Sequence, residues 1–89
     1  MGIRKLNNKY FNVISKNVLK YRELRGLSQP DMCRELALLG INMYNNDIYR
    51  IEHNKKSVKD FELYAISKVL KVTIDQLLEG IDKKFSDTK

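Results

Sequence analysis

The chain has 89 residues, of which 43% are hydrophobic and 31% are charged, and its formal net charge is +6. This length allows one small domain with a modest core rather than two, and the composition is not that of a disordered chain. With one cysteine and one histidine, the chain can form neither an internal disulfide nor a zinc site of its own.

Hydropathy also argues against a membrane protein. No apolar run approaches the length of about 20 residues that a membrane-spanning helix needs. The N-terminal segment is basic, but no apolar stretch typical of a signal peptide follows it. We therefore expect a reduced, cytoplasmic protein with no membrane partner, no metal and no cofactor.

The positive charge is concentrated at one end of the chain. Residues 1–25 contain seven Lys or Arg side chains and one acidic residue, whereas the remaining residues contain ten of each sign. Residues 1–11 are interpreted as a basic N-terminal arm. Such asymmetry favours a polyanionic partner, and the alternative is a solubilising tail. An anionic membrane is disfavoured because the first helix has no Trp and no clean division into polar and apolar faces.

The first predicted helix begins after Asn12, interpreted as its N-cap, and runs to about Arg25. Gly26 follows at the position where a left-handed residue commonly ends a helix. The side chains expected to face inward, which recur at helical spacing, are Ile14, Val18 and Tyr21.

The second predicted helix begins after Ser28, which together with Asp31 resembles a capping box. Pro30 is tolerated in the first turn of a helix. The expected buried stripe of this second helix is Met32, Leu36 and Leu39, and Gly40 ends the helix.

The third predicted helix covers residues 45–53, with Ile48 and Ile51 on one face. Asn54 is expected to end it, because Asn tolerates the left-handed conformation. Tyr44 is a poor N-cap, so Asn42 or Asn45 is expected to take that place.

Two more helices complete the predicted domain. The fourth covers residues 60–70, with side chains available for burial at Phe61, Leu63, Ile66, Val69 and Leu70. A short fifth helix contains Leu77 and Leu78; it is capped by Thr73 with Gln76 and ended by Gly80. Residues 12–80 therefore read as an all-α domain of five helices, and residues 81–89 as a frayed C-terminal tail.

The outward face of the third helix is rich in hydrogen-bonding groups. At 100° per residue, one stripe collects Asn45, Asn46, Tyr49, Arg50 and His53. In the major groove of DNA, Asn can pair with adenine and Arg with guanine through two hydrogen bonds. The stripe therefore favours DNA reading, and a plain solvated face is the alternative.

Three segments in order carry a family resemblance: "YRELRGLSQPDMCREL", "IYRIEHNKK" and "YAISKVLKVTIDQLL". Together, over residues 12–79, they resemble the helix-turn-helix domain of the phage repressor/Cro (XRE) family of bacterial transcriptional regulators. The resemblance implies a compact, five-helix, lambda-repressor-like DNA-binding domain, with the second and third helices as the helix-turn-helix. The stretch from Cys33 to Ile48 is longer than in most of the family, which implies a longer second helix or a wider turn.

The resemblance also implies roles for particular residues. Base contacts would come from Asn45, Asn46, Tyr49 and Arg50. Contacts to the DNA backbone would come from the start of the second helix, at Ser28 and Gln29. From their charge and position alone, further backbone contacts are expected from Arg4, Lys5 and Lys9 of the arm and from Lys55, Lys56 and Lys59, although a solvated charge run is an alternative for the last three. Arg22 would pair with Glu52 as a structural ion pair. Cys33 occupies the place of a small residue between helices, so a structural role is favoured over redox sensing.

The expected function is sequence-specific binding of double-stranded DNA as a transcriptional regulator, with repression favoured over activation. The resemblance to this family also implies a homodimer that binds a two-fold symmetric operator. No catalytic role is expected, because Ser, Cys and His do not occur in a nucleophile arrangement. The alternative is an antitoxin-like or adaptor module on the same fold that binds an unidentified protein partner, with Ile81 and Phe85 as candidates for its apolar surface.

Overall fold

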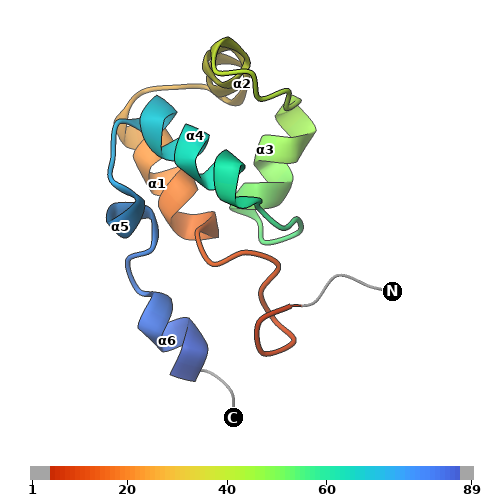
Figure 1. The fold of residues 1–89 in the computed structure, drawn as a ribbon, viewed down its shortest axis with the longest axis vertical. Coiled ribbons are helices and arrows are strands. Elements are labelled where there is room, and N and C mark those ends of the chain that lie inside the picture. The colour runs from red at the N-terminus through yellow and green to blue at the C-terminus, as the bar shows by residue number, and fades with distance from the viewer. Residues whose placement is uncertain (1–4, 87–89) are drawn as a thin grey trace.

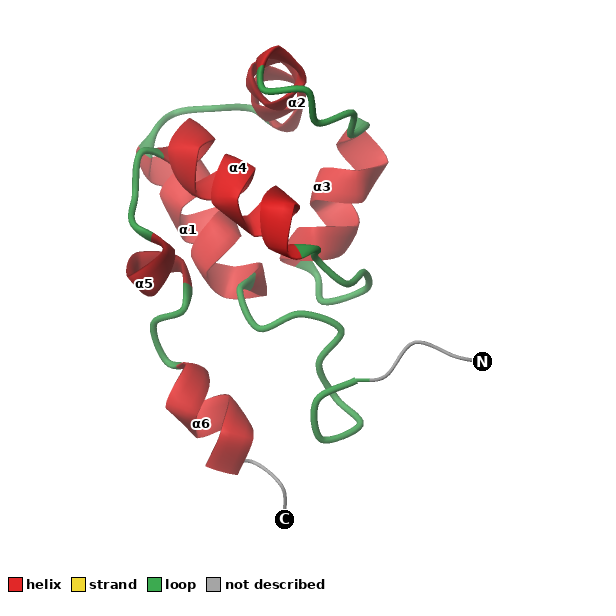
Figure 2. Cartoon of the chain, viewed as in Figure 1, coloured by secondary structure: helices red, strands yellow, loops and turns green. Residues whose placement is uncertain are grey.

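The computed structural model describes residues 5–86, which form six helices and no strand (Figures 1 and 2). The helices are α1 (Ser15–Leu24), α2 (Gln29–Leu38), α3 (Asn45–Glu52), α4 (Asp60–Leu70), α5 (Ile74–Leu77) and α6 (Ile81–Ser86). The predicted all-α class is confirmed. Within the described span, no helix has the length and apolar character needed to cross a membrane.

The first five helices enclose one core. Helix α1 packs against α3, α4 and α5, and α2 packs against α3 and α4. In Figure 1, α4 lies in front of α1, with α2 above them and α3 to one side. The buried apolar side chains are Ile14, Val18, Tyr21, Met32, Leu36, Met43, Ile48, Ile51, Ala65, Ile66, Val69, Leu70 and Leu77. Most of the positions predicted to face inward are therefore buried.

Two residues predicted to be buried are exposed: Leu39 is 51% exposed and Phe61 is 55% exposed. Leu39 is the C-cap of α2 and lies one turn beyond Leu36, the last residue of that helix in the core. Phe61 lies about 140° around α4 from Ile66, on the outer side of the helix. The prediction for Leu39 extends the buried stripe past the last residue of α2, whereas the prediction for Phe61 does not consider which face of α4 the residue lies on.

Predicted capping boxes begin two of the helices. In α2, the Ser28 hydroxyl accepts from Asp31 N at 3.1 Å, and the Asp31 carboxylate accepts from Ser28 N at 3.0 Å. In α5, Thr73 and Gln76 exchange the equivalent bonds at 3.0 and 2.8 Å. These bonds satisfy backbone N–H groups that the helix leaves without partners, which fixes where each helix begins.

Left-handed residues end helices where the sequence predicts them. Gly26 has φ +70° after α1, and Asn54 has φ +56° after α3. Only Gly adopts this conformation without steric cost, and Asn is among the few other residues that tolerate it. The chain can therefore reverse sharply after each of these helices.

Asn12 does not cap α1 as predicted. The helix begins at Ser15, and Asn12 is buried with its side-chain oxygen accepting from Ile14 N and the Ser15 hydroxyl. Its amide nitrogen donates to Ile51 O at 3.1 Å and to Lys56 O at 2.9 Å. Asn12 therefore ties the start of α1 to the end of α3 and the loop after it.

Both terminal segments are more structured than the sequence suggests. Residues 81–86, for which a frayed tail is expected, form α6. In the basic arm, residues 5–11 fold into a turn in which Asn7 and Asn8 are left-handed, with φ +54° and +60°. The Asn7 amide donates to Lys84 O of α6 at 2.7 Å, so the two terminal segments hold each other below the five-helix core (Figure 1). Arg4 lies outside the described residues.

Candidate nucleic-acid interface

The inward-facing side chains of helix α3 hold it against the rest of the domain. Ile48 and Ile51 are fully buried, and Glu52 is 5% exposed. The Glu52 carboxylate accepts from Arg22 Nε at 2.5 Å, from Arg22 Nη2 at 3.1 Å and from Gln29 Nε2 at 3.1 Å. These bonds join α3 to α1 and to the first residue of α2. The orientation of α3 relative to both helices is therefore fixed by one carboxylate and two apolar side chains.

Arg22 and Glu52 form the ion pair that the resemblance implies. Because the hydrogen bond to Glu52 favours the charged guanidinium, it raises the pKa of Arg22 above its ordinary value. The remaining Arg22 nitrogen, Nη1, donates to Leu27 O at 2.9 Å, so the pair also holds the turn between α1 and α2.

The opposite side of α3 faces solvent. The stripe predicted there is exposed along its whole length: Asn45, Asn46, Tyr49, Arg50 and His53. Tyr49 and His53 stack with 4.0 Å between ring centroids, and His53 Nδ1 lies 2.8 Å from Tyr49 O. Arg50 reaches only one acceptor within residues 5–86, Lys55 O, at a long 3.4 Å. The arginine side chain is therefore free to bind a stronger acceptor.

The N-terminus of α3 differs from the prediction. Neither Asn42 nor Asn45 caps it; Tyr44 is the N-cap residue, and Asp47 accepts from Tyr44 N at 2.9 Å. A carboxylate from inside the helix thus replaces the missing side-chain cap. The Asn45 oxygen instead lies 3.6 Å from the Cys33 sulfur of α2.

Tyr44 belongs to the exposed surface at the start of α3, and sequence reasoning treated it only as a poor cap. Its side chain is 78% exposed and precedes Asn45 and Asn46 directly. A phenol offers both a donor and an acceptor beside two amides. The signal in the sequence was an aromatic residue just before the helix and outside its apolar stripe.

The start of α2 is less available to an anion than the sequence suggests. The Gln29 amide is turned toward Glu52, and the Ser28 hydroxyl is engaged by Asp31. Hydrogen bonds from Ser28 lower the pKa of Asp31, so this helix end already carries a carboxylate. Pro30 has no N–H, which leaves the Gln29 N–H as the free backbone donor of the first two positions.

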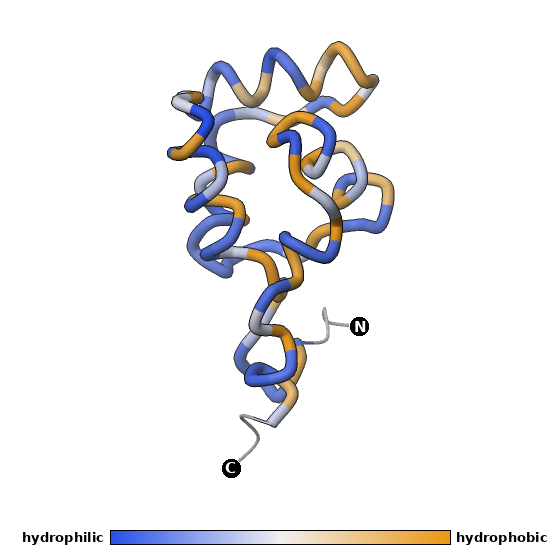
Figure 3. Tube along the Cα trace, turned by 90° about the vertical axis from the view of Figure 1, so that its left-hand side faces the viewer, coloured by the Kyte–Doolittle hydropathy of each residue, from blue (hydrophilic) through white to orange (hydrophobic). Residues whose placement is uncertain are grey.

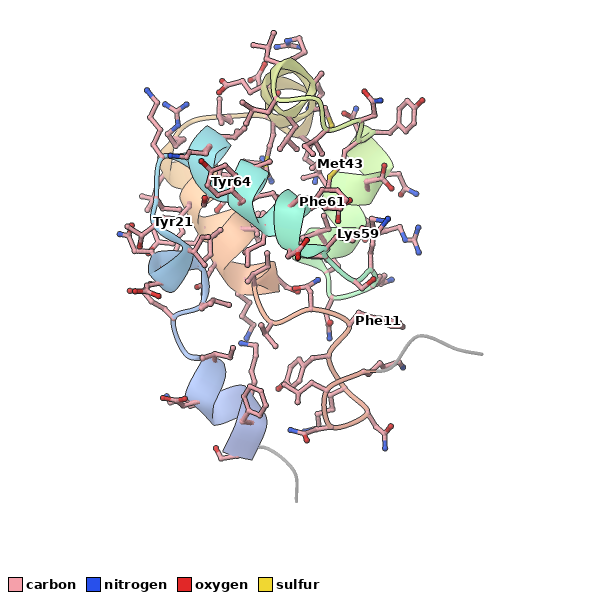
Figure 4. All side chains as sticks on the ribbon, viewed as in Figure 1. Phe11, Tyr21, Met43, Lys59, Phe61 and Tyr64 are labelled. Atoms are coloured by element: carbon pink, nitrogen blue, oxygen red, sulfur yellow. The ribbon has the colours of Figure 1, made fainter. Side chains whose placement is uncertain are left out.

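The remaining basic candidates lie beyond the C-terminal end of α3. Lys55 and Lys59 are exposed in the loop before α4, and Lys56 is half-buried. The Lys59 ammonium lies 5.8 Å from the centroid of the Phe61 ring (Figure 4). All three lysines follow the exposed stripe directly in the chain, so the positive charge of this loop adjoins that surface.

Asn54 holds the N-terminal turn, residues 5–11, against the C-terminal end of α3. Its amide nitrogen donates to Lys9 O at 2.7 Å, and its oxygen accepts from Phe11 N at 2.8 Å. Lys5 and Lys9 are exposed, and the Lys5 ammonium lies 4.7 Å from the centroid of the Phe11 ring. Residues 45 positions apart in the sequence are thus joined at the end of α3, which no local pattern indicates.

Cys33 packs against the core as a half-buried side chain between α2 and α3. Burial raises the pKa of its thiol, and the nearby Asp47 carboxylate acts in the same direction. A raised pKa disfavours the thiolate, which is the reactive form of cysteine. This environment fits the structural interpretation of Cys33.

No group of three or more His, Cys, Asp and Glu side chains that could hold a metal ion occurs in the part of the chain that the structure describes. Comparison with known proteins found no matching family model, no matching curated protein and no matching solved structure.

Proposed function

We propose that the chain binds double-stranded DNA, with α2, the turn after it and α3 acting as a helix-turn-helix. The observation that carries this proposal is the division of α3 into two faces. Ile48 and Ile51 are fully buried, while the exposed stripe offers amide, phenol, guanidinium and imidazole groups. The acidic side chains of the same helix, Asp47 and Glu52, accept hydrogen bonds from Tyr44 N and from Arg22, so each carboxylate already has a partner outside the exposed stripe.

The chemistry of this stripe suits the edges of base pairs. The major groove admits one helix, and there an Asn can make two hydrogen bonds to adenine and an Arg two to guanine. Asn46 and Arg50 are four residues apart, which places them one turn from each other on the same side of α3. We assign base contacts to Asn45, Asn46, Tyr49 and Arg50, and add Tyr44 because it is exposed beside them.

Contacts to the phosphates are assigned to the basic residues beyond α3. Lys55, Lys56 and Lys59 lie in the loop after the helix, and Asn54 holds the backbone of Lys9 against the end of the same helix. In this proposal the start of α2 contributes the Gln29 N–H rather than the Gln29 side chain, because that side chain is bonded to Glu52. Neutralised phosphates release counterions, so affinity should fall steeply with added salt.

A regulator built this way acts by occupying its site, so repression is the expected outcome, in the cytoplasm and without catalysis. The fold could also serve as an antitoxin-like or adaptor module. That role would use an apolar surface; the exposed Phe85 of α6 is one candidate, at 56% exposure. It predicts weak DNA binding with no sequence preference.

The experiment that tests the proposal is selection of bound duplexes from a random DNA library. The full chain should enrich one short motif, and a variant in which Asn46 and Arg50 are both changed to Ala should not. Because both residues are exposed, circular dichroism should show an intact fold in that variant. Recovery of no motif with the unchanged chain would contradict specific DNA binding and favour the adaptor role.

A further inference from the structure

Helix α2 ends in leucines that the core does not use. Leu36 is its last fully buried residue, yet the chain continues to Leu38 at 86% exposure and Leu39 at 51% exposure. Two neighbouring leucines exposed to this degree keep apolar surface in water, which is unfavourable unless something covers it. Figure 3 shows this hydrophobic end of α2 at the top of the chain.

The two leucines form one wall of an open groove. The groove has a volume of about 410 Å³ and lies between the end of α2 and the last turns of α4; it is lined by Glu35, Leu38, Leu39, Lys68 and Val69. Helix α4 extends the same surface with Phe61 and Tyr64, each 55% exposed (Figure 4). Phe61, Tyr64 and Lys68 recur at helical spacing, so they form a continuous stripe beside the groove.

The charges at the groove are balanced, although the whole chain has a net charge of +6. Glu35 lies on the α2 wall and Lys68 on the α4 wall. Glu35 has a partner in Arg25, but at 3.6 Å and with its side chain 40% exposed. Among residues 5–86 the Lys68 ammonium has no carboxylate partner, and it lies 5.3 Å from the Tyr64 ring centroid. A polyanion or an anionic membrane would therefore find little excess positive charge here.

We propose that this groove, with its Phe61–Tyr64–Lys68 stripe, binds a second copy of the chain. A two-fold axis sets the same surface of two copies against each other, so that residue i of one copy meets residue j of the other and j meets i, and the surface must be complementary to itself. Here the apolar α2 wall of one copy meets the apolar α4 stripe of the other. Glu35 of one copy then faces Lys68 of the other, and the axis generates this pair twice.

The residues that line the groove include none from α3, so a second copy that covers the groove does not thereby cover the exposed stripe of α3. The interface does not depend on DNA binding, and it can be measured without DNA. It defines which surface makes the dimer, whereas the DNA-binding proposal concerns another surface of the same domain.

The test is sedimentation equilibrium of the full chain without DNA over the micromolar range. The unchanged chain should form dimers. Leu38→Gln removes one leucine from each copy and should raise the dissociation constant about tenfold or more. The matched control is Phe85→Gln, which removes another large exposed apolar side chain, 56% exposed, from α6, at the other end of the molecule (Figure 1). It should leave the dissociation constant unchanged.

Charge reversal distinguishes a specific Glu35–Lys68 pair between copies from nonspecific hydrophobic association. Lys68→Glu alone sets two like charges against each other twice across the axis and should weaken the dimer. The double variant Glu35→Lys/Lys68→Glu restores opposite charges and should recover the dimer, with circular dichroism confirming that each variant is folded. A chain that stays monomeric, a dimer insensitive to Leu38→Gln, or a dimer lost in Phe85→Gln would overturn the proposal. A monomer that still enriches a DNA motif would leave the proposed function intact.

Discussion

Arg22 of α1 and Glu52 of α3 are joined by two hydrogen bonds, of 2.5 Å from Nε and 3.1 Å from Nη2. The Glu52 side chain is 1% exposed and that of Arg22 is 13% exposed. The buried charge of Glu52 is tolerated because the Arg22 guanidinium, of opposite charge, is held against it by hydrogen bonds. The pair therefore positions α3 more than it adds net stability, and its importance appears when one member is removed.

Glu52→Ala should reduce the free energy of unfolding by about 3 kcal/mol, because it leaves the Arg22 guanidinium without its carboxylate and the Gln29 amide without its acceptor. The measurement is chemical denaturation followed by circular dichroism. Glu23→Ala is the matched control: Glu23 is exposed in α1, so that substitution should cost no more than about 0.5 kcal/mol. Equal costs for the two variants would show that Arg22 and Gln29 find other partners when the Glu52 carboxylate is removed, and would contradict a role for the pair in holding α3.

Asn54→Gly should release the N-terminal turn while keeping the backbone after α3 in its left-handed conformation. Asn54 has φ +56°, which Gly adopts freely, so the substitution removes the side-chain bonds to Lys9 O, Phe11 N and, at 3.4 Å, Asn12 N without straining the backbone. Exchange of the Phe11 amide hydrogen with solvent should become much faster. Asn8→Gly is the control, because Asn8 is also left-handed at φ +60° but is exposed within the turn. Unchanged protection of Phe11 in the Asn54 variant would mean that the turn is held by other contacts.

The Asp31 carboxylate should titrate below the usual range for aspartate, because the Ser28 N–H and hydroxyl hydrogen-bond to its charged form and lower its pKa. A lowered folded-state pKa gives stability that is present above the unfolded-state pKa and is lost as the pH falls through the folded-state pKa. NMR titration of the Asp31 carboxyl group measures this. Ser28→Ala should move the pKa of Asp31 upward, toward its ordinary value. Because the Ser28 N–H remains in this variant, a titration unaffected by Ser28→Ala would contradict the contribution of the Ser28 hydroxyl.

Neutralising Lys5 and Lys9 together tests whether the N-terminal turn contacts DNA. Substitution by Gln keeps the turn, whereas deletion of residues 1–9 would also remove the Lys9 carbonyl that Asn54 binds and the Asn7–Lys84 contact. If both ammonium groups neutralise phosphates, the slope of log affinity against log salt should fall by about 1.8. Lys71→Gln, at an exposed position after α4, is the control and should leave the slope unchanged. An unchanged slope in the double variant would make the turn a structural or solubility feature.

Local patterns predicted the helices because each helix carries its own signals. The Ser28–Asp31 and Thr73–Gln76 boxes, Gly26 and Asn54 all act within a few residues of their helix ends. The exposed stripe of α3 follows from the same periodicity. These features depend on residues within about one helical turn of each other, so they can be predicted without knowledge of the tertiary structure.

Contacts between distant segments were not predictable in this way. Asn12 has the side chain of a helix cap, but acceptors at Ile51 and Lys56 give it a buried bridging role instead. Gln29 turns toward Glu52 rather than toward solvent because that carboxylate lies beside the start of α2. The N-terminal turn and α6 are ordered together through Asn7, although each segment alone resembles a tail. In each case the deciding partner is more than 20 residues away in the sequence.

Arg50→Ala tests how the exposed face of α3 would meet DNA. Arg50 is exposed, and its one hydrogen bond within residues 5–86, to Lys55 O, is long at 3.4 Å, so little is lost from the fold when the side chain is removed. A contact with two hydrogen bonds to guanine is worth about 1–3 kcal/mol of discrimination, whereas a phosphate contact adds affinity without preference. Arg50→Ala should therefore weaken binding to the selected motif by that amount and relax the preference at one base pair.

Lys55→Ala is the matched comparison, because Lys55 is exposed just beyond α3 and is assigned to a phosphate. It should weaken the selected motif, its single-base variants and random duplex by similar factors and lower the salt slope by about 0.9. Titrations of both variants on these three kinds of DNA distinguish the two roles. If Arg50→Ala weakens specific and random binding equally, Arg50 contacts only the backbone. The longer stretch between Cys33 and Ile48 would then have turned this face of α3 away from the base edges.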